Sequence, residues 1–280
     1  MRNFTFKGLL LTAVFMLLGC LSIQAANDDL ITKQITINLD KAGTLPNKIA
    51  SSEMYKITNL EIIGEINGTD WNMIREMAGR DNRGYGTEGK LSVLDLSEAK
   101  IVKGGDSYYP GDNCYTSNDE IGEKAFKDCS RLTSLTLPVG ITSIGYDAFA
   151  YCSGLTSLRL PAGITSIGEF AFSYCSGLTS IYVYAEKVPR IGRYAFEGCA
   201  SRKCTLYVPK GTYDNYRLSE FGYFENIVEF DATGIDKTTT STDVEEVSRY
   251  SLNGQRLAVP VKGLNIVKYS DGSARKVVVK

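Results

Sequence analysis

The sequence predicts a mostly β solenoid, a right-handed coil whose stacked turns each contribute short parallel strands. Three observations lead to this fold class. A block of about 23 residues recurs four times, its apolar residues alternate with polar ones as in half-buried strands, and proline or glycine follows each run. A repeated unit of this length cannot bury its apolar face alone, so neighbouring copies must stack on one another.

The repeat is defined by residue types that return together. Each copy begins at an isoleucine, and successive copies are 23 residues apart, with one extra residue before the last. Phenylalanine follows five residues after each isoleucine, and cysteine eight residues after it. These positions are Ile121, Ile144, Ile167 and Ile191; Phe126, Phe149, Phe172 and Phe196; Cys129, Cys152, Cys175 and Cys199.

One copy reads as two short strands joined by turns. Residues 132–137 alternate leucine with Thr or Ser, so the leucines point inward and Thr136 points outward. Pro138 then turns the chain into a second extended stretch at 141–144. Ahead of the first strand, a tight turn places Phe126 in the core.

This pattern resembles the leucine-rich repeat, and specifically the 23-residue BspA-type repeat of bacterial surface proteins. The run LTSLTLP from Leu132 supplies the L-x-x-L-x-L core of that repeat. Gly140 takes the place of the usual asparagine, and Cys129 lies earlier, as in the BspA-type variant. The resemblance covers Ile121 to Glu229, and it implies adhesion to host matrix proteins or to other bacteria.

Residues 26–120 are predicted to hold the N-terminal cap and irregular copies of the repeat, with the cap itself at 30–50. L-x-x-L-x-L spacing returns at 57–62 and 91–96. Between these two copies the sequence predicts a helix. Thr69-Asp70 caps its start, one apolar face buries it, and Gly79 ends it. The residues of that apolar face are Trp71, Ile74 and Met77.

Residues 121–230 are predicted to hold the regular repeats and a C-terminal cap from Tyr213 onward, covered by aromatic side chains. Residues 231–247 are rich in Thr, Asp and Glu, which predicts a linker. Residues 248–280 are predicted to form a β tail of two hairpins, the first turning at Asn253-Gly254. The ending resembles the sorting tail of type IX secretion cargo. The covering aromatics of the cap are Tyr216, Phe221 and Phe224.

The first 25 residues read as a secretory signal peptide. Arg2 and Lys7 precede an apolar run from Gly8 to Ile23, and Ala25-Ala26 follows it. An alternative is lipoprotein processing at Cys20, because Leu-Leu-Gly-Cys resembles a lipoprotein cleavage box. We therefore expect an exported protein, extracellular or on the outer-membrane surface, with no transmembrane segment.

Composition excludes several classes of function. The chain of 280 residues has no histidine, which removes Ser-His-Asp and Cys-His catalysis and the common zinc sites. A formal net charge of −1 leaves no electrostatic footprint for nucleic acid. We expect no catalytic residues, metal or cofactor, although catalysis by carboxylates needs no histidine and stays an alternative.

The outward strand positions form the first candidate site. A solenoid presents such positions as one extended binding surface, and tyrosine and arginine are frequent interface anchors. The alternative is that exposed strand positions favour Thr and Tyr for β-propensity alone. The candidate strand-face residues are Asp95, Thr136, Arg159, Tyr182 and Tyr207, aligned also with Glu61.

A loop and a cysteine column form two further candidates. The insertion at 104–120 carries acidic residues and Tyr108, Tyr109 and Tyr115, so it is either a binding loop or a surface loop without a partner. Its carboxylates lack calcium-loop spacing. The repeat cysteines, Cys129, Cys152, Cys175 and Cys199, are predicted to stack as buried thiols, since their parallel Cβ vectors disfavour bridges. The alternative is disulfide pairing, which exported chains often use.

Together these features favour a non-catalytic, monomeric binding protein that recognises a protein partner through its strand face. A second hypothesis is an accessory protein of a surface glycan system, in which the tyrosines would stack on sugar rings. An enzyme acting through carboxylates is the third.

Overall fold

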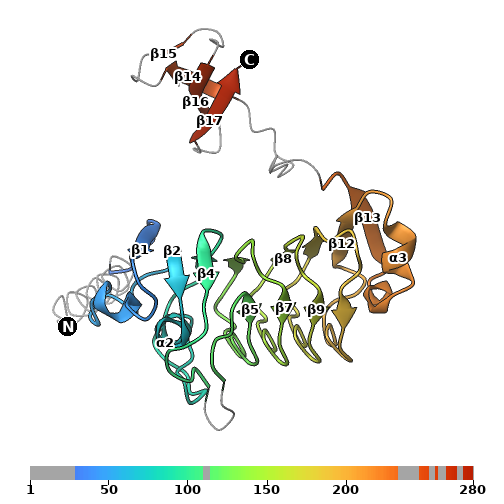
Figure 1. Cartoon of the computed structure of the whole chain (residues 1–280), viewed down its shortest axis with the longest axis horizontal. Helices are drawn as coiled ribbons and strands as arrows, with labels where there is room; N and C mark the ends of the chain where they lie inside the picture. The colour runs from blue at the N-terminus through green and yellow to red at the C-terminus, as the bar shows by residue number, and fades with distance from the viewer. Residues whose placement is uncertain are drawn as a thin grey trace, which may run out of the picture. The chain divides into compact units, whose positions relative to one another are not determined.

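The computed structural model describes residues 29–109 and 114–232, and four strands of the tail at 246–251, 256–257, 263–269 and 274–279 (Figure 1). The chain divides into two compact units, residues 1–232 and 233–280. The predicted signal peptide, Cys20 and the linker residues 233–245 lie outside the described residues, so those predictions remain predictions.

The first unit is a solenoid of stacked parallel strands, as the repeat predicts. Each regular coil contributes one strand to a sheet built from the L-x-x-L-x-L runs and a two-residue strand to a second sheet (Figure 1). The first series comprises β1 (Ile35–Leu39), β2 (Asn59–Ile66), β3 (Val93–Asp95) and β6 (Ser134–Thr136), with β4 (Ala99–Ile101) beside β2, and then β8 (Ser157–Leu160), β10 (Ser180–Val183), β12 (Thr205–Pro209) and β13 (Asn226–Phe230). The second comprises β5 (Glu120–Ile121), β7 (Ser143–Ile144), β9 (Ser166–Ile167) and β11 (Arg190–Ile191).

The core repeats as regularly as the sequence does. Phe126, Phe149, Phe172 and Phe196 stack one above another, with ring centroids 5.3, 5.0 and 5.4 Å apart. Such offset ring pairs stabilise beyond their buried area. The alanine that precedes each phenylalanine is also buried.

The predicted helix is present as α2 (Gly68–Met77), with Trp71, Ile74 and Met77 buried. The predicted cap residue is wrong, because the N-cap is Asn67. Its side chain accepts from Thr69 N at 3.0 Å, and the Asp70 carboxylate accepts from Asn67 N at 2.9 Å. Asp70 also accepts from Leu45 N in η1 (Leu45–Asn47), which ties the preceding segment to the helix.

The C-terminal end of the solenoid is covered by α3 (Tyr213–Arg217), η2 (Glu220–Tyr223) and β13. Tyr216, Phe221 and Phe224 are fully buried there, and Tyr216 donates to the Ala185 carbonyl at 2.6 Å. β13 pairs in parallel with β12, so it covers the end of one of the two sheets.

The second unit is an antiparallel sheet in the order β15-β14-β16-β17. Its strands are β14 (Glu246–Ser251), β15 (Arg256–Leu257), β16 (Gly263–Tyr269) and β17 (Ala274–Val279). The first strand begins two residues before the predicted start of the tail at 248.

Candidate binding surfaces

The strand-face candidates lie in one row across the coils. The ladder registers place Glu61 opposite Asp95, and Asp95 opposite Thr136. They also place Arg159 opposite Tyr182, and Tyr182 opposite Tyr207. Because facing residues of parallel strands point to the same side, these side chains share one face of the solenoid.

The C-terminal part of this row is an aromatic cluster around Tyr182. The Arg159 guanidinium lies 4.8 Å from the centroid of the Tyr182 ring, and Tyr207 stacks on Tyr182 at 4.3 Å with an interplanar angle of 6°. Phe230 meets Tyr182 edge-on at 5.9 Å, and Arg159 donates to the Tyr184 hydroxyl at 2.8 Å. Every member therefore has its position fixed by a neighbour.

Burial and the neighbouring Tyr207 raise the pKa of Tyr182 above its ordinary value. β8 and β12 lie on opposite sides of β10, so Arg159 and Tyr207 cover the two faces of the Tyr182 ring. Tyr182 therefore has no open ring face on which a sugar ring could stack.

The N-terminal part of the row is acidic and internally hydrogen-bonded. The Glu61 carboxylate accepts from Gln34 Nε2 at 2.7 Å and from Thr36 Oγ1 at 2.6 Å. Asp95 accepts from the backbone N of Ser97 at 2.8 Å. These carboxylates keep residual acceptor capacity toward solvent but already have partners within the chain.

The three tyrosines of the insertion at 104–120 lie in three different environments. Tyr108 is 1% exposed and its ring lies 6.2 Å from Trp71, so the prediction that it binds a ligand is wrong: the insertion folds back and uses this ring to extend the core. Tyr109 is half-buried, with Arg75 and Lys124 at 5.2 and 5.3 Å from its ring. Tyr115 is half exposed and is the one of the three that solvent reaches freely.

The four repeat cysteines form a buried column. The thiols of Cys152, Cys175 and Cys199 each donate to the carbonyl of the phenylalanine in the preceding coil, at 3.0, 3.1 and 3.2 Å. Burial raises the pKa of the Cys199 thiol to about 12, and raises those of Cys152 and Cys175 well above the ordinary value. Protonated and enclosed thiols of this kind are poor nucleophiles, which gives the column a structural role.

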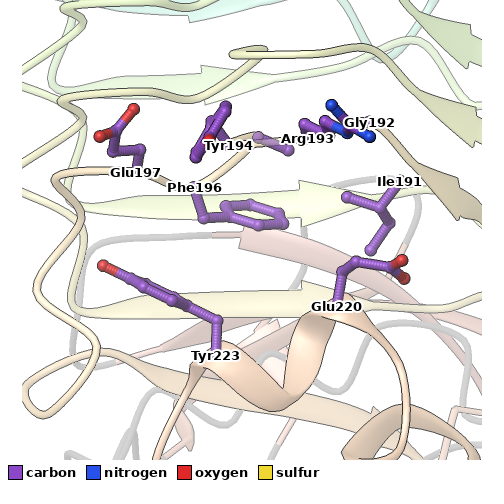
Figure 2. Close-up of a pocket in the computed structure, with 9 residues that line it drawn as sticks. Ile191, Gly192, Arg193, Tyr194, Phe196, Glu197, Glu220 and Tyr223 are labelled. Atoms are coloured by element: carbon purple, nitrogen blue, oxygen red, sulfur yellow. The ribbon is translucent and has the colours of Figure 1, made fainter.

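A pocket that sequence reasoning missed lies at the C-terminal end of the turns (Figure 2). It holds about 300 Å³ between the last coil and η2. One wall is a continuous stretch of chain, and η2 supplies Glu220 and Tyr223 opposite it (Figure 2). The lining residues of the last coil are Ile191, Gly192, Arg193, Tyr194, Ala195, Phe196 and Glu197. The only sequence signal for it is that the repeat stops after this coil.

Within the described ranges, no cluster of three or more Cys, Asp or Glu side chains is arranged to hold a metal ion. Over the same ranges, no helix has the length and apolar character needed to cross a bilayer.

Comparison with known proteins identifies the repeat. Residues 113–219 match, in six copies, the family model described as the BspA type leucine rich repeat region. A crystal structure of a leucine-rich repeat protein from Bacteroides ovatus is similar over 64% of this chain, with 23% sequence identity and a TM-score of 0.36. The match covers 44% of that protein, so this chain spans less than half of its length. No curated protein matches the chain.

Proposed function

We propose that this chain, which carries a BspA-type leucine-rich repeat region, is a non-catalytic adhesion protein that acts outside the cell and binds a protein partner through its strand face. Leucine-rich repeats serve in general as binding scaffolds, which supports the coarse assignment. The protein partner and the surface location are the parts that we propose.

The observation that carries this proposal is the fixed cluster of Arg159, Tyr182 and Tyr207. An interface loses free energy when it must immobilise long side chains on binding. Here the guanidinium and both rings already hold one another in place, half-buried and facing outward. Arginine and tyrosine in such settings are the residues that most often dominate protein–protein affinity.

The same cluster argues against the glycan alternative. Sugar recognition by tyrosine needs an open ring face, and both faces of Tyr182 are covered within the row. What the cluster offers instead is ring edges, hydroxyl groups and a guanidinium. These groups suit hydrogen bonding and packing against the polar rim and apolar centre of a protein surface.

Binding to immobilised matrix proteins and to bacterial surface extracts tests the proposal, with a glycan array alongside. We expect Arg159→Ala combined with Tyr182→Ala to weaken protein binding about 30-fold or more, as for interface hot spots. Tyr151→Ala with Tyr174→Ala is the matched control, because these tyrosines also stack, at 4.9 Å, and are exposed on the turns rather than the strands.

Equal loss in both double variants would contradict the strand face as the site. Glycan binding that survives both double substitutions, with no protein binding in the wild type, would favour the accessory function instead.

Location is tested separately by cell fractionation of the full-length protein against a version that ends at Asp231. Equal arrival of both at the surface would contradict a sorting role for the tail.

A further inference from the structure

The turns that carry the phenylalanines are joined from coil to coil by backbone hydrogen bonds, and we call this set the turn ladder. In each turn three alternate N–H groups donate to carbonyls of the next coil. Phe126, Phe149 and Phe172 supply the central bond, to Ala148, Ala171 and Ala195, at 2.7 Å each time. One bond runs the other way, as from Gly192 N to Ile167 O at 2.8 Å.

The N-terminal end of the turn ladder is closed by side chains of α2. The Ala125 carbonyl, which no earlier coil can bind, accepts from Trp71 Nε1 at 3.0 Å and from the Arg75 guanidinium at 2.9 Å. Arg75 also donates to the Lys124 carbonyl at 2.9 Å, although it is fully buried. The inserted helix thus supplies donors to the central ladder carbonyl of the first regular turn. Among the described residues, the two flanking ladder carbonyls, those of Glu123 and Lys127, accept no hydrogen bond.

The C-terminal end of the turn ladder has no such closure. By the repeat spacing, the donors of the last coil are the N–H groups of Tyr194, Phe196 and Gly198, and its acceptor is the Ile191 carbonyl. Within residues 29–109 and 114–232, these three N–H groups donate no hydrogen bond and this carbonyl accepts none. Phe196 is buried and Ile191 half-buried, and backbone groups in such places are usually paired, so these two require a partner. Tyr194 and Gly198 are exposed, so water can also pair their N–H groups.

The C-terminal cap supplies aromatic side chains where a further coil would place its own. Its described residues supply no backbone groups to pair with the last turn. Phe221 and Phe224 pack on Phe196, with centroids 5.4 and 5.1 Å away, where the next phenylalanine of the stack would lie. β13 continues the sheet of β12, whereas β11 has a neighbour on one side only. The pocket of Figure 2 is the space that the backbone of a further turn would occupy.

We propose that this pocket binds a segment of another polypeptide through its main chain, with the sequence Gly-x-x-Ala. The segment would adopt the turn conformation of the repeat, in which the second x residue has positive φ in every coil. The mode is analogous to strand addition, with one more turn added to an open backbone edge. The segment would donate one N–H to Ile191 and offer the carbonyls of alternate residues to Tyr194 and Phe196. This site is separate from the strand face, so either can fail without the other.

The glycine follows from the spacing of the coils. A Cβ built on Gly168 would lie 2.6 Å from the Gly145 carbonyl carbon, and one on Gly192 would lie 2.3 Å from Glu169 N. A segment that approaches Gly192 in the same way therefore needs glycine at the contact. The alanine matches the buried Ala125, Ala148, Ala171 and Ala195 of the coils.

A second copy of this chain does not fit as the partner. Each Gly-x-x-Ala segment of the repeats lies inside the stack, with its alanine 0–3% exposed, so no copy can present one without unfolding. Two carboxylates, Glu197 and Glu220, line the pocket against the single guanidinium of Arg193. This balance favours a segment that carries lysine or arginine.

The test uses the full chain and the peptide IGEKASKD, which is residues 121–128 with serine in place of Phe126, because the cap already fills that position. We expect saturable shifts of the backbone amide signals of Tyr194 and Phe196 by NMR, and at least tenfold slower hydrogen exchange at saturation. The control peptide IAEKASKD, with alanine in place of Gly122, should cause neither effect.

A charge-reversal variant provides a second readout. Glu197→Lys with Glu220→Lys should weaken binding of the peptide at least fivefold, whereas Glu53→Lys, exposed near the N-terminus, should leave it unchanged. The proposal is overturned if the two amides do not respond, if IAEKASKD binds as well as IGEKASKD, or if both amides are already protected without peptide.

Discussion

The two ends of the turn ladder meet the same problem in different ways. At the N-terminal end, Trp71 and Arg75 of an inserted helix donate to the Ala125 carbonyl, the central ladder carbonyl of the first regular turn. At the C-terminal end, the cap stacks Phe221 and Phe224 on the core, but the N–H groups of Tyr194, Phe196 and Gly198 have no acceptor among the described residues. The difference shows that burying the apolar core and pairing the backbone are separate tasks in a solenoid.

The largest loss of unfolding free energy is expected from a substitution at the N-terminal end of the turn ladder. Trp71→Ala removes a fully buried indole and its hydrogen bond, so we expect a loss of about 3–5 kcal/mol in unfolding free energy. Tyr194→Ala at the open end, where the ring is 60% exposed, should change it by about 1 kcal/mol or less. Urea unfolding followed by circular dichroism measures both.

Similar losses from the two variants would contradict the contrast.

Between the two ends, the coils depend on close backbone contact at glycines such as Gly168. Gly168→Ala would place a Cβ 2.6–2.7 Å from backbone atoms of the preceding coil, so we expect a loss of about 1–3 kcal/mol. Gly163→Ala is the matched control, since its Cβ would lie 3.6 Å from the nearest atom, and it should change stability by less than about 1 kcal/mol. Thermal unfolding of both variants distinguishes them, and equal melting temperatures would show that coil spacing is not set by glycine.

The buried column of cysteines reports on the interior of the solenoid between its two ends. Burial raises the pKa of Cys175 well above its ordinary value of about 9. A thiol that stays protonated when folded contributes stability that is complete below the unfolded pKa and is lost as pH rises above it. Stability should therefore be level from pH 6 to 8 and fall above pH 9.

Each thiol contributes at most about 1.4 kcal/mol per pH unit to this fall. We expect Cys175→Ala to flatten the slope between pH 9 and 11 by about that amount, measured by urea unfolding at each pH. A slope unaltered in Cys175→Ala would mean that this thiol ionises as readily in the folded chain as in the unfolded one.

The repeat made the solenoid predictable. Residue types that return about every 23 positions fix which side chains stack, so the phenylalanine column, the cysteine column and the row from Thr136 to Tyr182 follow from spacing alone. Asp95 and Tyr207 join the row through their L-x-x-L-x-L runs rather than through the 23-residue spacing. The helix was also readable, because Trp71, Ile74 and Met77 share a face. Its cap was misassigned since Asn67, Thr69 and Asp70 all have cap-forming side chains, and only the backbone conformation shows which one precedes the first turn.

The less regular features were beyond sequence reasoning for physical reasons. Tyr108 lies in an insertion that has no repeat to set its register, and its burial depends on how the loop folds over Trp71. Arg75 is a charged residue on an apolar face, and its role is visible only when the unpaired ladder carbonyl of Ala125 is located. The open C-terminal edge of the turn ladder is made of backbone groups. Every residue type carries such groups, so no residue type in the sequence indicates this edge.

Native-state hydrogen exchange of four equivalent amides tests the contrast between the ends most directly. Phe126, Phe149 and Phe172 each donate to the next coil, and Phe196 occupies the same place in the last coil with no acceptor in the described residues. The predicted result is strong protection of the first three amides and exchange of Phe196 at least a hundredfold faster. Protection of Phe196 equal to that of Phe172 would contradict the open end of the turn ladder.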